Sequence, residues 1–116
     1  MRLKTEIWIK AYVRRCHVAG VFAGVVRHGD DDAGAIFIKI NRLDGTAALY
    51  GPAPMGLETD GQDRSFSAHI DRANASERDV DGYLARQVEF DSDLWIVEVE
   101  DRAGRHFLDD WLATGV

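Results

Sequence analysis

The 116-residue chain has a single cysteine, only two prolines and no long apolar run. Cys16 alone cannot form an internal disulfide. The longest apolar run, residues 18–26, contains glycines and is far shorter than the roughly 20 residues that a membrane span requires. Charged residues near the N-terminus argue against a secretory signal. We therefore expect a cytoplasmic protein with no membrane segment.

The length predicts one globular domain over residues 1–116. A chain of this size buries roughly two thirds of the surface that its unfolded form exposes. Such a core is large enough to fold without a metal, a disulfide or a cofactor, and we predict none.

Acidic residues outnumber basic ones, and the charge is unevenly distributed. The net charge is −6, but residues 1–45 carry +3 and the remainder carries −9. An acidic protein is poorly suited to general binding of the nucleic-acid backbone. The asymmetry indicates that the N-terminal part interacts with an acidic surface.

The clearest local pattern is a β-hairpin over residues 35–50. β-branched residues alternate along its first half at Ile36, Ile38 and Ile40. Asp44-Gly45 supplies the left-handed positions of a tight turn. The register stays open: a three-residue loop sets Ile38 opposite Tyr50, whereas a four-residue loop sets it opposite Leu49.

The remaining elements follow from periodicity and caps. We predict a helix over residues 5–19, capped by Thr5 and ended by Gly20, although a strand over residues 6–10 is an alternative. A buried strand over 21–26, a proline-bearing loop after Tyr50, a short strand over 66–70 and a helix after the Ser76 capping box follow. The chain then continues with a strand over 94–99 and a short helix over 107–112.

Together these elements predict an α+β fold with a mostly antiparallel sheet. We expect a three-strand meander, formed by the strand over 21–26 and the hairpin, plus one or two further strands. Two to three helices are expected to pack on one face of the sheet.

Several short runs resemble one known family. They are Glu6-Ile7-Trp8, Gly29-Asp30, Asp32-Ala33-Gly34-Ala35, Asn41-Arg42-Leu43-Asp44-Gly45, Leu49-Tyr50-Gly51-Pro52-Ala53-Pro54 and Asp93-Leu94-Trp95 before Glu98. In combination they are similar to the small alphaproteobacterial proteins classed as domain of unknown function 1491. The resemblance implies a bacterial, single-domain protein, and it supplies no catalytic residues.

Two groups of residues suit chemistry, and each has a plainer interpretation. His28 with the run Asp30 to Asp32 offers oxygen ligands for a cation, but its spacing does not match an EF-hand. An acidic, solvated turn between two strands is the favoured interpretation. Glu98, Glu100 and His106 could form a hydrolase site. A nuclease-like site would also require a nearby lysine, and none follows Lys39.

Other conspicuous side chains are expected to be structural. Cys16 falls on the apolar arc of the first helix and is predicted to be an inert core thiol. Core packing is also predicted for Trp8, Trp95 and Trp111.

The first helix is the predicted partner surface. Leu3, Ile7 and Ala11 form an apolar ridge outside the main apolar arc. Its basic rim contains Lys4, Lys10, Arg14 and Arg15. A rigid corner with Tyr50, Pro52 and Pro54 is a second candidate.

The favoured prediction is thus a non-enzymatic protein-interaction module. Its partner is an acidic protein or a second copy of the chain, giving a homodimer. Two alternatives remain: a nucleic-acid-associated protein that uses the basic flank, and a ridge covered by the chain's own C-terminal helix or acidic loop.

Overall fold

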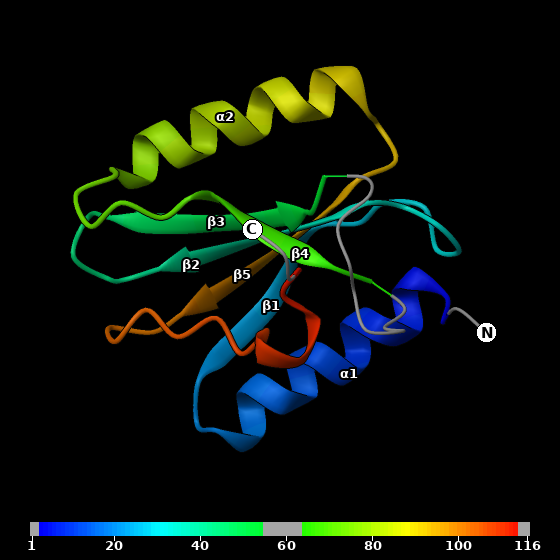
Figure 1. Cartoon of the computed structure of the whole chain (residues 1–116), viewed down its shortest axis with the longest axis horizontal. Helices are drawn as coiled ribbons and strands as arrows, with labels where there is room; N and C mark the ends of the chain where they lie inside the picture. The colour runs from blue at the N-terminus through cyan, green and yellow to red at the C-terminus, as the bar shows by residue number, and fades with distance from the viewer. Residues whose placement is uncertain (1–2, 55–63, 114–116) are drawn as a thin grey trace.

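In the computed structural model, five strands form one sheet with a helix on each face (Figure 1). The structure describes residues 3–54 and 64–113. The elements are α1 (Thr5–Val18), β1 (Phe22–Arg27), β2 (Ile36–Asn41), β3 (Ala47–Pro52), β4 (Phe66–Ile70), α2 (Glu77–Phe90), β5 (Trp95–Glu100) and the one-turn 3₁₀ helix η1 (Asp109–Trp111). The predicted α+β class is confirmed.

The last strand in the chain lies inside the sheet. The strand order is β1-β5-β2-β3-β4, with β5 parallel to β2 and antiparallel to β1. The antiparallel meander therefore consists of β2, β3 and β4, and the predicted pairing of residues 21–26 with the hairpin is wrong. Four of the six β5 residues are apolar and buried, as expected for an interior strand with both faces covered.

The hairpin between β2 and β3 has the three-residue loop. Ile38 lies opposite Tyr50, and Arg42 N donates to Thr46 O at 3.1 Å to close the loop. Gly45 has a φ of +90°, as a tight turn requires, and Leu43 also has a positive φ of 62°. The structure thus resolves the register that the sequence left open.

The two helices cover opposite faces of the sheet, which corrects the prediction that they pack on one face (Figure 1). Trp8 and Tyr12 of α1 pack with Ile36 and Ile38, whereas Val80 of α2 packs in the cluster of the other face. On the α1 face, β2 and β5 present apolar side chains throughout. On the α2 face, the apolar Phe37 and Ile96 lie beside the buried Lys39, so this face also requires a cover.

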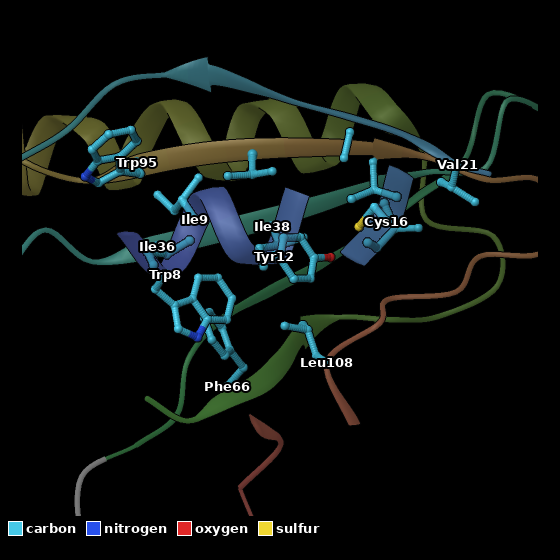
Figure 2. Packing of buried hydrophobic residues seen from close by; sticks show 14 of the residues in the cluster. Trp8, Ile9, Tyr12, Cys16, Val21, Ile36, Ile38, Phe66, Trp95 and Leu108 are labelled. Atoms are coloured by element: carbon cyan, nitrogen blue, oxygen red, sulfur yellow. The ribbon is translucent and has the colours of Figure 1, made fainter. Parts of the chain in front are cut away.

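The core on the α1 face is built around aromatic rings (Figure 2). Trp8 stacks on Tyr12 with ring centroids 5.2 Å apart and contacts Phe66 at 5.1 Å. Trp111 meets Trp8 edge-on at 5.0 Å. Trp8 and Trp95 are buried and Trp111 is half-buried, so the predicted core role of the tryptophans is confirmed.

Helix α1 begins on a tertiary contact and not on the predicted Thr5 cap. The first backbone N–H groups, those of Thr5 and Glu6, donate to the carbonyl oxygens of Asp32 and Asp31. The Thr5 hydroxyl instead donates to Gly34 O at 3.1 Å. The loop after β1 therefore satisfies donors that a side-chain cap satisfies in other helices.

Three further predictions are adjusted. Strand β1 is an edge strand with half of its side chains exposed, because only β5 pairs with it. Strand β3 continues to Pro52, where a loop was predicted, and pairs with β4. Its pairing with β2 ends at Tyr50, so the N–H that Pro52 lacks is not needed by the sheet. The C-terminal helix is only the turn η1. Most of the predicted loop, residues 55–63, lies outside the described residues.

A buried ion cluster joins α2 to the sheet. Lys39 of β2 is 5% exposed, and its Nζ lies 2.7 Å from Glu77, 2.8 Å from Asp81 and 3.5 Å from Glu98. Asn41 Nδ2 donates to Glu77 at 3.1 Å. Burial opposes the lysine charge, but the hydrogen bonds to Asp81 and Glu77 outweigh it and raise the Lys39 pKa.

Replacing Lys39 tests this cluster. We expect Lys39→Met to lower the free energy of unfolding by about 2–3 kcal/mol, somewhat less than for a fully buried pair, because Asp81 can turn toward water. The Lys39 pKa is raised on folding, so its contribution is complete below the ordinary lysine value of 10.5 and is lost as the pH rises through the folded pKa. Urea unfolding at pH 7 and above pH 10.5 measures both effects. The control is Lys10→Met, which removes an exposed ion pair with Glu6 and should change the free energy of unfolding by less than about 0.5 kcal/mol. Equal stability of the Lys39→Met and wild-type proteins at pH 7 would contradict a structural role.

Two glycine substitutions have opposite expected effects on stability, one in the hairpin turn and one in α2. Gly45→Ala should destabilise by about 1–2 kcal/mol, because φ is positive although a Cβ there meets no atom within 4 Å. Gly82→Ala, in the interior of α2, should stabilise by about 0.5–1 kcal/mol, because its Cβ meets only Arg86 Nη1 at 3.8 Å. Thermal unfolding of both variants checks the difference, and a neutral Gly45→Ala would contradict the turn geometry.

Candidate partner-binding surface

An open groove of about 550 Å³ lies between α1 and β1. Ile9 and Val13 of α1 line one wall, and Gly24 and Val25 of β1 line the other. The groove forms because α1 crosses the outer edge of the sheet where no further strand follows β1. Val25 is 46% exposed, so this apolar surface is accessible from outside.

The rim of the groove is basic. Lys10, Arg14 and His17 line it from successive turns of α1, and all three are exposed. No acidic residue lines the groove among the residues that the structure describes. Since the whole chain carries −6, the groove is a local cationic site on an acidic protein.

Exposed apolar side chains concentrate on the two elements that flank the groove. Among the described residues, most of the large apolar side chains that face solvent belong to α1, β1 or the adjoining segments: Leu3, Ile7, Val18, Phe22, Val25 and Val26. Of these side chains, Val25 lines the groove, and an exposed apolar side chain in a groove fits a binding site.

The predicted ridge on α1 borders this groove. Leu3 is 42% exposed and Ile7 is 49% exposed, so each keeps part of its apolar surface accessible. Ala11 lines the groove itself. Of the predicted rim, Lys10 and Arg14 come together there.

The other two predicted basic residues are engaged elsewhere. Lys4 lies 3.6 Å from Asp32 in an exposed ion pair. Arg15 pairs with Asp110 at 3.2 Å and lies over the Trp111 ring, 4.1 Å from its centroid. Arg15 thus fixes the C-terminal segment on α1.

The proline corner lies away from the groove. Strand β3, which carries Tyr50 and Pro52, is separated from β1 by β5 and β2. Tyr50 is half-buried beside the His106 ring, with centroids 4.9 Å apart, while Pro52 and Pro54 line a separate hollow of about 430 Å³. The structure does not bring the two predicted binding regions together.

The hydrolase constellation is not assembled. Glu98 lies on the α2 face, next to Lys39 and Asn41. His106 lies on the α1 face, where its backbone oxygen accepts a hydrogen bond from Tyr12 and its ring contacts Tyr50. The sheet therefore separates the carboxylates from the imidazole. The lysine beside Glu98 is Lys39, and its contacts with three carboxylates fit a structural role.

The acidic loop is organised around the start of α1. Asp30 Oδ2 accepts hydrogen bonds from the backbone N–H of Asp32 and Ala33. Asp31 bonds to His28 at 2.6 Å, and with Glu6 these two side chains place ligand atoms within 4.8 Å of one another. Glu6 also pairs with Lys10 at 3.7 Å, so each of these charges already has a protein counterpart.

Cys16 lies in the core, as predicted, and is fully buried. Burial raises the pKa of its thiol, which lowers the thiolate fraction at neutral pH. The structure therefore gives this cysteine no nucleophilic character.

Sequence reasoning missed the β1 half of the groove. Gly24 and Val25 fell within an apolar run that was interpreted as a buried strand. Residues 21–26 include no polar side chain, so periodicity alone does not distinguish an interior strand from an apolar edge strand.

Known proteins with similar sequences and structures match nearly the whole chain. The family model described as a protein of unknown function, DUF1491, matches residues 3–109. A crystal structure of a DUF1491 family protein from Caulobacter crescentus is 38% identical, with a TM-score of 0.78, over 98% of this chain and all of that one. No functionally curated protein matches.

Two solution structures agree with this result. An NMR structure of a DUF1491 family protein from Caulobacter crescentus is 40% identical, with a TM-score of 0.75 over 98% of this chain and 99% of that one. The solution structure of an A. tumefaciens protein is also 40% identical, with a TM-score of 0.73 over 86% of each chain. Neither helix in the described part of the chain has the length and apolar character of a transmembrane span. The chain belongs to the DUF1491 family.

Proposed function

We propose that this protein is a non-enzymatic interaction module whose α1–β1 groove binds an acidic, partly apolar segment of another protein. The observation that carries the proposal is an open apolar groove with a basic rim on a protein of net charge −6. We place the module in the cytoplasm, where the buried Cys16 thiol stays reduced.

The energetics favour an apolar contact with charged edges. Full burial of a valine or isoleucine side chain contributes about 1.5–3 kcal/mol, and Ile7 and Val25 each retain almost half of their exposure. The rim cations Lys10 and Arg14 add orientation and a faster approach for a negatively charged partner. Ordering of the partner offsets part of this gain.

A protein partner fits the groove better than a nucleic acid. Phosphate contacts require rows of cations, whereas the floor of this groove is apolar and Arg15 is held by Asp110 and the Trp111 ring. Salt separates the two candidates: affinity for a phosphate backbone falls steeply with added salt, and an apolar contact changes little.

A second copy of the chain is a less suitable occupant. Symmetric contact through the same groove would bring the basic rims of two copies together, and like charges across an interface are costly. Contact between the groove and an acidic region of another copy remains a distinct outcome in the experiment below.

Site-specific crosslinking in alphaproteobacterial cells tests the proposal. A photo-crosslinking amino acid replaces Ala11, which lines the groove and is exposed. Mass spectrometry should map the crosslink to an acidic segment of another protein. The crosslink should be lost with Arg14→Glu or Ile7→Glu, while Arg78→Glu, an exposed substitution on α2, leaves it intact.

The fold of these variants provides the control. Ile7 is 49% exposed, so Ile7→Glu should change the free energy of unfolding by no more than about 0.5 kcal/mol. Loss of folding in Ile7→Glu would show that the ridge is core. Crosslinks to this chain itself, to nucleic acid, or to a partner retained by Arg14→Glu would each contradict the proposal.

A further inference from the structure

Strand β1 is an edge strand with outward-facing backbone groups. Val21 N donates to Cys16 O, and Ala23 O accepts a hydrogen bond from His17 Nε2 at 3.0 Å. A strand residue directs its N–H and C=O to the same edge of the strand. The backbone N–H and C=O of Ala23 and Val25 therefore point away from β5. In the part of the chain that the structure describes, no backbone outside the sheet bonds to Val25.

The opposite edge of the sheet, at β4, is partly covered by the chain itself. Phe66 of β4 forms a parallel bridge with Leu112, and Ala113 N donates to Phe66 O at 2.9 Å. The C-terminal segment therefore covers the start of the β4 edge. Within the described residues, the outer edge of β1 is contacted by His17, which lies 3.0 Å from Ala23 O, and the strand is irregular between Val25 and Arg27. Such a bulge restricts edge pairing to the residues before it.

The side chains beside this edge suit a strand with two different faces. On the α1 side, the groove offers Val13 and Val25 with Lys10 and Arg14 at its rim. On the other side, Phe22 is 59% exposed and its ring lies 3.3 Å from the position of a Cβ at Gly24. Alternate residues of an added strand point to these two faces.

We propose that the partner segment binds as an additional strand along residues 21–25 of β1, with its carboxylates toward Lys10 and Arg14. This inference rests on the proposed function and specifies the conformation and chemistry of its partner. The added strand bonds to the backbone of Val25 and the N–H of Ala23, and its apolar side chains enter the groove. A helix in the same groove would leave these backbone groups unpaired.

The charge complementarity identifies the occupant as an acidic segment. The groove rim is basic on an otherwise acidic surface, so an extended segment that alternates apolar and acidic residues satisfies both the floor and the rim. A second β1 strand carries Arg27 and no carboxylate, and it does not supply this chemistry.

Panning of a random 12-residue peptide library against the intact protein tests this inference. The enriched peptides are synthesised in three forms: unmodified, and N-methylated on either of the two alternating sets of residues. Calorimetry measures affinity, and ¹⁵N-labelled protein reports chemical shifts and amide exchange. Arg14→Glu and the matched Arg78→Glu are measured in parallel.

We expect acidic, apolar peptides whose affinity falls by at least about tenfold with Arg14→Glu and is unchanged with Arg78→Glu. N-methylation of one alternating set should weaken binding by at least about tenfold and that of the other set by little, because only one set faces β1. The amide of Val25 should exchange at least about tenfold more slowly in the complex.

The opposite outcomes are distinguishable. One outcome is that binding depends on Arg14, but both N-methylated forms bind equally well and the exchange rate of the Val25 amide is unchanged. This outcome would overturn strand addition and would still support binding in the groove. No enrichment, or peptides whose shifts map to α2 and ignore Arg14→Glu, would overturn both the strand and the proposed function.

Discussion

The hydrogen-bonded position of β5 between β1 and β2 is the constraint on which the rest of the structure depends. It pairs antiparallel with β1 and parallel with β2, so it joins the N-terminal helix–strand unit to the hairpin. Because β5 is interior, its two faces require α1 on one side and α2 on the other. With β5 inside, β1 is left at the edge, where the groove forms.

Lys39 shows how a charge is accommodated within such a sheet. Its neighbours Ile38 and Ile40 face α1, so the lysine must face α2 in a strand whose residues are almost all buried. Three carboxylates from α2 and β5 surround its Nζ. A buried lysine is tolerated only with such partners, and they in turn restrict how α2 lies on the sheet.

Local patterns in the sequence were sufficient for most elements but not for their arrangement. The Asp44-Gly45 turn, the Ser76 cap and the Gly20 helix end depend on nearest neighbours, and the structure has all three. The position of β5 depends on pairing with residues far away, which periodicity does not report. The same limit applies to the site. The ridge on α1 could be predicted from helical periodicity, whereas the exposure of Val25 beside α1 depends on the edge position of β1 in the sheet. Lys39 in an apolar strand was a usable sign of a buried ion pair.

The strand order also bears on how the chain acquires its shape during synthesis. Strand β1 is synthesised before β2, β3, β4 and α2, whereas β5, the strand with which it pairs, follows all of them. Until β5 emerges, the apolar residues of β1 have no ladder partner, and Phe22 and Val25 are open to any extended chain nearby. Pairing with β5 is therefore the step that closes this side of β1 to other chains.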